Sequence, residues 1–242
     1  MSLLIQAITF DFWNTLSVGE GGGGLRHQHI RRALEQAGYG SISDAQIDNA
    51  MSRAWREWDR IWEQEQRTFG AAQWISLVLA DLNASLAQPQ REALVDLTAT
   101  AGMQKDPLLV DGVATVLPNL ARRYRLGVIS DTGLSPGWML RQWMASHGIL
   151  QYFAHLTFSD ELGISKPHPE AFLTTLDRLG VAPQAAIHVG DYPRTDVVGA
   201  QAVGMRAVRF AGVQDWDDGT VRAHAVIRSH HELEPLLDRW QS

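Results

Sequence analysis

The sequence contains no cysteine among its 242 residues. Without cysteine the chain cannot form disulfide bonds, thiolate metal sites or iron–sulfur clusters, and it has no cysteine nucleophile. The chain also has no excess of positive charge, because its 21 Lys and Arg are outnumbered by 27 Asp and Glu, which gives a net charge of −6. A protein without a basic footprint is not expected to bind nucleic acid, so we expect a small molecule as its partner.

Long apolar segments are also missing from the sequence. Residues 1–10 are mostly apolar, but they lack a positively charged start and end at Asp11, which favours a buried strand over a signal peptide. Residues 71–80 form the next most apolar segment, which is about half the length of a bilayer span. We therefore expect a cytoplasmic protein with no membrane partner, present as a monomer or a homodimer.

Short apolar segments alternate with helical patterns along most of the chain. Strands are predicted at residues 3–10, 126–129, 186–189, 205–210 and 225–227, with a weaker candidate at 155–158. Helices are predicted at residues 136–147, 168–179, 195–203 and 231–240. Apolar strands that alternate with helices indicate an α/β fold, with a Rossmann-like parallel sheet covered by helices on both faces.

Residues 18–105 interrupt this alternation with an all-helical pattern. Ser43 and Gln46 have the spacing of a capping box that opens a helix. An apolar stripe continues from there at helical spacing through Ile47, Met51, Ala54, Trp55, Trp58, Ile61 and Trp62. We expect its tryptophans to pack the helices together, with the wall of a pocket or a dimer face as the less favoured alternative. The pattern predicts an inserted all-helical domain at 18–105 and an α/β core made of residues 1–17 and 106–242. Flexible hinges are expected at 19–24 and 101–107.

Reactive side chains follow the predicted strands where the strands end. Asp11 follows the first strand, Ser130 the second, and Asp191 and Asp196 a later one, while Lys166 lies in a loop. Alone, each of them is typical of a turn or a helix cap. Together, at the carboxyl edge of a parallel sheet, they suit phosphoryl transfer. A carboxylate can attack phosphorus, Mg²⁺ prefers oxygen ligands, and a lysine binds phosphate.

The order of these residues resembles four sequence motifs of the haloacid dehalogenase (HAD) superfamily. The first motif, Asp-x-Asp-x-Thr, is matched by residues 11–15, except that Trp13 replaces the second aspartate. Ser130 matches the second motif, and Lys166 followed by Pro-x-Pro-Glu matches the third. A Gly-Asp-x(4)-Asp pattern at 190–196 matches the fourth. The helical insert is similar in position to the C1-type cap, which selects the substrate in this family.

The resemblance implies a role for each matching residue. Asp11 is implied as the nucleophile that becomes an aspartyl-phosphate, and Thr15 as a support of its loop. Ser130 and Lys166 are implied to bind the transferred group. The implied Mg²⁺ ligands are Asp11, the backbone carbonyl of Trp13, Asp191 and Asp196, the last directly or through water. The residues expected to contact the substrate are Trp13, Asn14, Arg26, Asp131 and Thr132.

Trp13 stands where phosphatases of the family carry their general acid and base. Indole has no proton that titrates near neutral pH, and general acid–base help is worth typically ~10²–10⁴ in rate. Asp131, His27 and His29 are the candidates to replace it. We therefore expect phosphatase activity that is slow but present, because the nucleophile, the metal ligands and the lysine remain.

Two other functions stay open. The 2-haloacid dehalogenases of the family also carry an aromatic residue at the position of Trp13, use no metal, and bind a carboxylate through arginine, a role open to Arg26. They differ at the fourth motif, where this chain keeps Asp191 and Asp196, and such carboxylates would repel one another without a cation. A Mg²⁺-dependent phosphatase of a small phosphorylated metabolite is therefore favoured. The alternatives are a metal-independent 2-haloacid dehalogenase and a catalytically weak binding protein in which Trp13 crowds the site.

Overall fold

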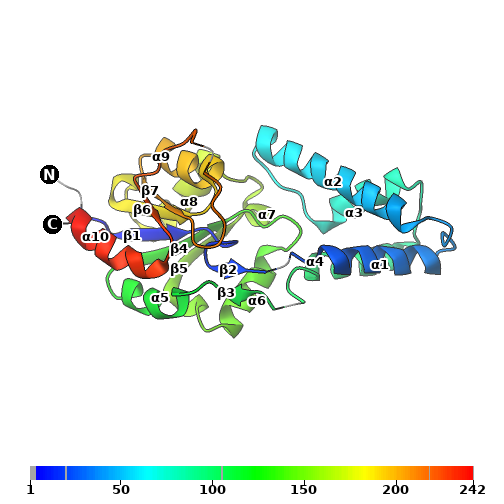
Figure 1. The fold of residues 1–242 in the computed structure, drawn as a ribbon, viewed down its shortest axis with the longest axis horizontal. Helices are drawn as coiled ribbons and strands as arrows, with labels where there is room; N and C mark the ends of the chain where they lie inside the picture. Colours follow the sequence, from blue (N-terminus) through cyan, green and yellow to red (C-terminus); the bar gives the residue numbers. More distant parts are fainter. Residues whose placement is uncertain (1–3, 20, 105, 218, 242) are drawn as a thin grey trace.

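The computed structural model describes residues 4–19, 21–104, 106–217 and 219–241. Its centre is a six-stranded sheet in the order β5-β4-β1-β6-β7-β8, in which every neighbouring pair is parallel (Figure 1). The strands are β1 (Ala7–Phe10), β4 (Arg125–Ser130), β5 (Phe153–Phe158), β6 (Ala186–Gly190), β7 (Arg206–Phe210) and β8 (Ala225–Ile227). The predicted fold class is confirmed. Every predicted strand is present, although the first begins at Ala7 and residues 1–3 lie outside the described residues.

The register of the sheet brings three strand ends side by side. Phe10, the last residue of β1, pairs with Val128 of β4 and Val189 of β6. All four residues of β1 are buried, as expected for a central strand of a parallel sheet. The chain segments that follow these three strands therefore meet at one edge, which faces the helical insert in Figure 1.

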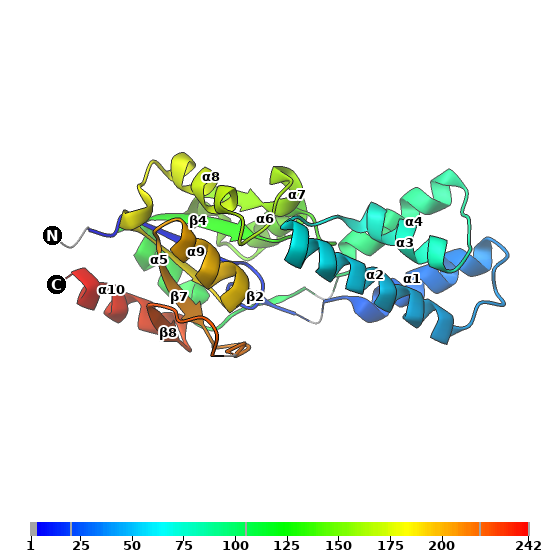
Figure 2. The ribbon, with the colours of Figure 1, turned by 90° about the horizontal axis from the view of Figure 1, so that it is seen from above.

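Helices cover both faces of the sheet (Figure 2). On one face α5 (Val113–Ala121), α6 (Gly137–Ser146) and α10 (Leu233–Gln241) bury their apolar side chains against those of β1 and β4. On the other face α8 (Pro169–Leu179) and α9 (Val198–Ala202) do the same. Short helical turns fill connections at Leu150–Tyr152, Ser159–Leu162 (α7), Pro183–Ala185, Pro193–Val197 and His230–Glu232.

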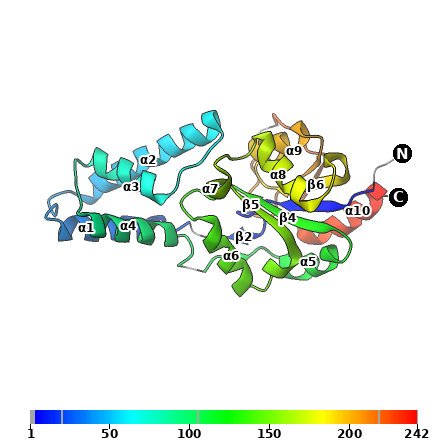
Figure 3. The same ribbon diagram turned by 180° about the vertical axis from the view of Figure 1, so that it is seen from behind.

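The insert forms a bundle of four helices beside the strand ends (Figure 3). These helices are α1 (Gly23–Gln36), α2 (Asp44–Glu65), α3 (Ala71–Asp81) and α4 (Gln88–Thr100). The capping box of Ser43 and Gln46 is confirmed at the start of α2. Ile30, Ile47 and Trp74 are fully buried and form the centre of a separate apolar core. The division of the chain at 17/18 and 105/106 stays a prediction, and residues 20 and 105 lie outside the described part.

Two short strands join the bundle to the sheet domain. β2 (Ser17–Val18) pairs antiparallel with β3 (Leu108–Leu109). The sequence analysis missed both, because two-residue strands leave no periodicity. The chain therefore leaves and re-enters the sheet domain at adjacent points. The two predicted hinge segments adjoin these paired strands. Within the described ranges, none of the helices is long and apolar enough to cross a membrane.

Gly22 lies at this junction, directly before α1. Its φ angle of 72° is in the left-handed region, which glycine adopts without a steric penalty. A Cβ at this position would lie 2.5 Å from the carbonyl carbon and oxygen of Ala101. Both the backbone angle and the available space therefore require glycine.

We expect Gly22→Ala to lower the free energy of unfolding by about 1–2 kcal/mol, because alanine in the left-handed region costs about that much before the clash is counted. Gly24→Ala is the matched control. Gly24 lies inside α1, a Cβ there meets nothing within 4 Å, and alanine favours a helix over glycine by up to ~1 kcal/mol. Urea unfolding of both variants measures the difference, and equal stabilities would contradict this account.

Candidate active site

Lys166 joins the strand ends at the centre of the site. Its Nζ lies 2.5 Å from Asp11 Oδ1 and 2.6 Å from Asp196 Oδ1. All three side chains are buried. Burial alone would lower the pKa of Lys166, but the charges of Asp11 and Asp196 outweigh it and raise that pKa. Lys166 is therefore a permanent cation held between two carboxylates.

Asp196 is held in place by the sheet behind it. His188 of β6 directs Nε2 toward Asp196 Oδ1 at 3.0 Å, and the Tyr192 backbone N–H donates to Asp196 Oδ2 at 2.9 Å. On the other side of the ring, Thr9 Oγ1 lies 2.8 Å from His188 Nδ1. A Cβ on Gly190 would lie 2.3 Å from Asp196 Cγ, which explains the glycine of the Gly-Asp pattern. Burial favours a high pKa for Asp196, but Lys166 and His188 lower it below its usual value, so this carboxylate is ionised.

Among Asp11, Asp191 and Asp196, Asp191 is the carboxylate that forms no ion pair with a described residue. Its Oδ2 accepts a hydrogen bond from Trp216 Nε1 at 3.0 Å, and the Asn14 side chain also bonds to it. Burial and the nearby charge of Asp196 raise the pKa of Asp191 to about 7. Asn14 has a φ of 56°, a left-handed conformation that asparagine tolerates better than most residues.

The three carboxylates Asp11, Asp191 and Asp196 fit a divalent cation. Each can offer one oxygen such that the three oxygens lie within 4.8 Å of one another. Burial, followed by the charges of Asp196 and Asp191, raises the pKa of Asp11 against the opposing effect of Lys166. One ammonium group therefore leaves negative charge uncompensated. Mg²⁺ takes oxygen ligands from one or two carboxylates, so this donor set suits it.

Two hydroxyl groups at the site have no internal partner. Ser130 Oγ and Thr15 Oγ1 are buried, and neither has a hydrogen-bond partner among the described residues. Buried polar groups are usually hydrogen-bonded, so the unpartnered hydroxyl of Ser130, at the end of β4, suits a ligand oxygen. The Thr15 backbone carbonyl accepts a hydrogen bond from His230 Nε2 at 2.7 Å, which fixes the backbone at this residue.

A cavity of about 320 Å³ opens beside Asp11 and Lys166. Its aromatic wall, as we name it below, consists of Trp13, Trp58, Trp62, Tyr192 and Trp216. Trp62 from α2 stacks on Tyr192 at 5.7 Å and 27°, and Tyr192 meets Trp216 edge to face at 5.6 Å. Since Trp58 and Trp62 come from the insert and the other rings from the sheet domain, the cavity lies between the two.

Asp131 connects the two sides of this cavity. Its Oδ2 accepts a hydrogen bond from Trp62 Nε1 at 2.9 Å, and its Oδ1 accepts one from the Lys166 backbone N–H at 3.0 Å. Burial raises the pKa of Asp131 in spite of Lys166 and the Trp62 hydrogen bond. A second link between insert and sheet domain lies nearby, where the Ser165 N–H donates to the Gln66 carbonyl at 2.8 Å.

Of the predicted site residues, Thr132 and Arg26 are placed elsewhere. Thr132 Oγ1 donates to Asp160 Oδ1 at 2.8 Å and helps to hold the loop that follows β4. Arg26 is buried at the base of the bundle, where it donates to the backbone carbonyls of Thr98 and Gly21. Its guanidinium is thus occupied by the backbone, which corrects the expectation that it faces a substrate carboxylate. The expectation for Arg26 depended on its closeness to the predicted hinge along the sequence, and this closeness does not bring its side chain into the cavity.

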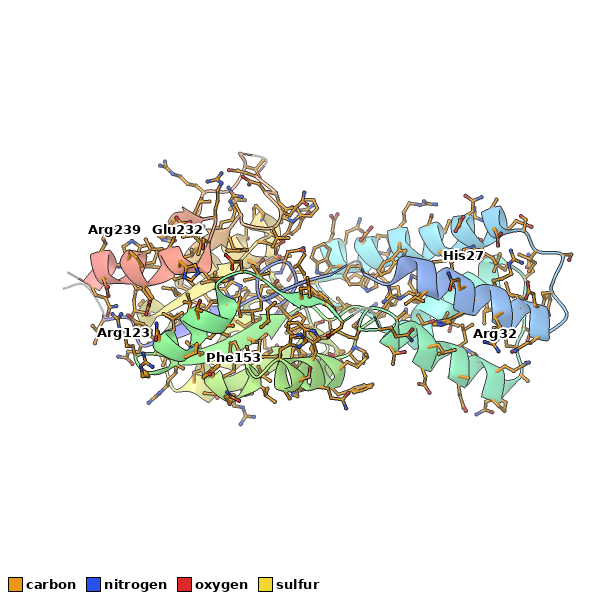
Figure 4. All side chains as sticks on the ribbon, turned by 60° about the horizontal axis from the view of Figure 1, so that its bottom comes forward. His27, Arg32, Arg123, Phe153, Glu232 and Arg239 are labelled. Carbon is orange, nitrogen blue, oxygen red and sulfur yellow. The ribbon has the colours of Figure 1, made fainter. Side chains whose placement is uncertain are left out.

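His27 is likewise not among the residues that line the cavity. It lies on α1 in the helical insert, with its Nε2 near Asp44 and Asp48 (Figure 4). The labelled Arg123, Glu232 and Arg239 mark the opposite end of the molecule in the same view. Among the three residues considered as replacements for the missing acid, Asp131 is the one that lines the cavity.

The sequence analysis missed the parts of the site that come from loops and from the insert. Trp62 was expected chiefly to pack the helices, with a pocket wall as the less favoured alternative, and it lies in the cavity wall. Trp216 was unassigned because it lies in a loop without periodicity. That loop is anchored by Arg209, whose buried guanidinium binds both Asp215 and Asp217 and so fixes the residue between them. The Asp-Trp-Asp sequence at 215–217, which follows a strand, was the one sequence signal that could have indicated this anchored loop.

The sequence profile of the haloacid dehalogenase-like hydrolases matches residues 5–204 of this chain. The chain belongs to this family. A 2-haloacid dehalogenase from Pseudomonas syringae pv. Tomato DC3000 matches with a TM-score of 0.74 at 26% identity, over 98% of this chain and 100% of that one. A HAD phosphatase from Thermococcus onnurineus gives a TM-score of 0.67 at 26% identity, over 96% and 98% of the two chains.

A curated relative, the glyceraldehyde 3-phosphate phosphatase of Methanopyrus kandleri, is 33% identical over 102 residues. This match covers 41% of the present chain and 42% of the relative, so the chain aligns with less than half of that protein's length.

His230 gives the site a measurable pH dependence of stability. Burial lowers the pKa of this histidine to about 4, from 6.5 in the unfolded chain. Because the unfolded state binds the proton more tightly, the free energy of unfolding falls as the pH drops from about 6.5 toward 4. At pH 5 the loss from this group is about 2 kcal/mol relative to pH 7.

We expect His230→Gln to reduce this loss, as measured by urea unfolding at pH 7 and pH 5. The matched control is His231→Gln at the neighbouring exposed position, which should keep the pH dependence of the parent protein. If both variants lose as much stability as the parent between the two pH values, His230 is not the group responsible.

Proposed function

We propose that this protein is a Mg²⁺-dependent phosphatase that hydrolyses the monoester of a small phosphorylated metabolite through a phosphorylated Asp11. One observation carries the proposal: Asp11 is held by Lys166 beside two further buried carboxylates, Asp191 and Asp196, on one cavity. We further propose that it acts in the cytoplasm, as a monomer or a homodimer.

The proposed reaction has two steps at Asp11. A carboxylate oxygen of Asp11 forms a bond to phosphorus while the bond from phosphorus to the alcohol oxygen breaks. Water then attacks the phosphorus of the aspartyl-phosphate, which releases inorganic phosphate and restores Asp11. Lys166 keeps Asp11 oriented, and the unpartnered Ser130 hydroxyl can donate to a phosphate oxygen.

Proton transfer is the weak point of this site. The leaving oxygen must gain a proton in the first step, and the attacking water must lose one in the second. The indole of Trp13 supplies neither. Asp131 is the carboxylate outside the acidic group that lines the same cavity. We propose that it accepts the proton of the attacking water in the second step, and that solvent water protonates the leaving oxygen in the first step, which keeps turnover slow.

Bound Mg²⁺ would neutralise charge on the phosphate and on the carboxylates as the reaction proceeds. Asp11, Asp191 and Asp196 would hold it, together with the backbone carbonyl of Trp13. The buried and mutually repelling carboxylates support this assignment.

The dehalogenase alternative has one specific observation in its favour. Trp13 lines the cavity, and the Pseudomonas syringae match bears the name 2-haloacid dehalogenase. Two observations weigh against it: Arg26 is bound to backbone carbonyls, and Asp191 adds a carboxylate that carbon–halogen displacement does not need. The binding-protein alternative is weakened too, because a cavity of about 320 Å³ remains open next to Trp13.

We expect Asp11→Asn to reduce p-nitrophenyl phosphate turnover at least about 10³-fold, because the nucleophile is lost. Asp96→Asn, at an exposed position of α4, is the matched control and should keep the parent rate. The parent activity should disappear in EDTA and return with Mg²⁺. Turnover that ignores EDTA would contradict the metal assignment. Chloride release from 2-chloropropionate in EDTA, without phosphate release, would favour the dehalogenase.

We expect Trp13→Asp to raise the phosphatase kcat by about 10²-fold, the lower end of what a general acid contributes. Trp13→Asn is the control, since it opens the same space without an ionisable proton. If Trp13→Asn speeds turnover as much as Trp13→Asp, the effect comes from space and not from proton transfer.

A further inference from the structure

The cavity carries more negative charge than its proposed chemistry uses. Its lining includes the carboxylates of Asp11, Asp131, Asp191 and Asp196, and the cation of Lys166. When all four carboxylates are ionised, one ammonium group and one divalent cation leave one negative charge over before a phosphate enters. A substrate that brings a second negative charge would add to this repulsion, and one that brings a positive charge would relieve it.

Asp131 is the carboxylate that remains after the metal and the lysine are accounted for. Its two oxygens accept hydrogen bonds from the Trp62 indole and from the backbone N–H of Lys166, and both donors are uncharged groups. Its contact with Trp62 places it where the helical insert meets the sheet domain. Asp131 therefore lies on the side of the cavity that faces the part of the substrate beyond its phosphate.

The aromatic wall surrounds this position with ring faces and edges. Trp62 lies against both Trp58, at 5.5 Å between ring centres, and Tyr192. The face of an aromatic ring attracts a cation, and tryptophan does so most strongly. Aromatic rings alone would accept any apolar group, but rings beside Asp131, a carboxylate that forms no ion pair with the described residues, favour a positively charged one.

The same lining disfavours an anionic partner group. Among the described residues that line the cavity, Lys166 is the one cationic side chain, and it is already bound to two carboxylates. Arg26 is held by backbone carbonyls outside the lining. A carboxylate on the substrate would thus find no counter-ion, whereas an ammonium group would find Asp131.

We propose that the substrate is the phosphate monoester of a small amino alcohol, whose ammonium group lies between the aromatic wall and Asp131. This inference rests on the proposed phosphatase function. A cavity of about 320 Å³ is at the lower end of the range for small-molecule sites, which limits the alcohol to a few carbon atoms.

The test compares esters that differ in charge and little else. Phosphate release is measured with Mg²⁺ for phosphocholine, for its uncharged isostere 3,3-dimethylbutyl phosphate, and for the anionic 3-phosphooxypropionate, with p-nitrophenyl phosphate as the general substrate. We expect kcat/KM for phosphocholine to exceed that of the uncharged isostere about tenfold or more, and the anionic ester to be poorest. O-phosphoethanolamine shows whether a primary ammonium serves as well. Equal or better turnover of the uncharged isostere would overturn the inference.

Variants locate the preference in the cavity. Asp131→Asn should bring the ratio of kcat/KM for phosphocholine and its isostere close to one, while Asp48→Asn, on the exposed side of α2, should leave that ratio unchanged. An unchanged ratio in folded Asp131→Asn would overturn the role of Asp131. A measurement on the parent protein needs no variant: choline should inhibit p-nitrophenyl phosphate turnover more strongly than 3,3-dimethylbutanol, and equal inhibition would count against the inference.

The outcomes separate this inference from the proposed function. If the protein hydrolyses p-nitrophenyl phosphate but shows no preference for the cationic ester, the proposed phosphatase function is supported and the proposed substrate class is overturned. No hydrolysis of any ester, in a preparation whose fold is intact by circular dichroism, overturns the phosphatase and the substrate class with it.

Discussion

The buried ammonium group of Lys166 is the interaction on which the site depends. A charge without a partner in a protein interior costs several kcal/mol, so Lys166, Asp11 and Asp196 can be buried only as a set. His188 and Thr9 extend this set into the middle of the sheet. The loops after β1 and β6 and the loop that carries Lys166 are therefore fixed relative to one another before any ligand binds. Removing the lysine would leave two carboxylates facing each other and a third close by.

The sequence predicted the parts of the fold that rest on regular patterns. Apolar segments and helical periodicity located the strands, and the rule that parallel strands end at one edge brought Asp11, Lys166 and Asp196 together before their distances were known. Arg26 was misplaced because closeness to a hinge along the chain says nothing about where a side chain turns. The sequence could not decide between packing and a pocket wall for Trp62, because the apolar stripe on α2 continues without a break past the centre of the bundle. Trp216 lies in a loop, where only tertiary contacts decide its position.

The tryptophans divide by structural role. Trp74 is buried within the bundle and Trp143 within the sheet domain, where each fills an apolar core. The rings around the cavity have a different role, since they come from both sides and contact one another across the boundary. The exposed ion pair between Arg194 and Glu63 spans the same boundary, but surface pairs of this kind contribute little. The boundary is therefore held by aromatic contacts, by the hydrogen bonds of Asp131 and Ser165, by the hydrogen bond between Thr68 and Ser159, and by Leu134, which packs in the core of the bundle.

The pairing of β2 with β3 has a consequence for how such a protein can evolve. Paired strands lie about 4.8 Å apart, so the insert begins and ends at almost the same point of the sheet domain. The entropic cost of closing a loop grows only slowly with its length. Because the two attachment points are adjacent, the insert can be lengthened, shortened or exchanged at little entropic cost to the sheet domain. The helical insert can thus be replaced while the buried charges of the sheet domain stay as they are.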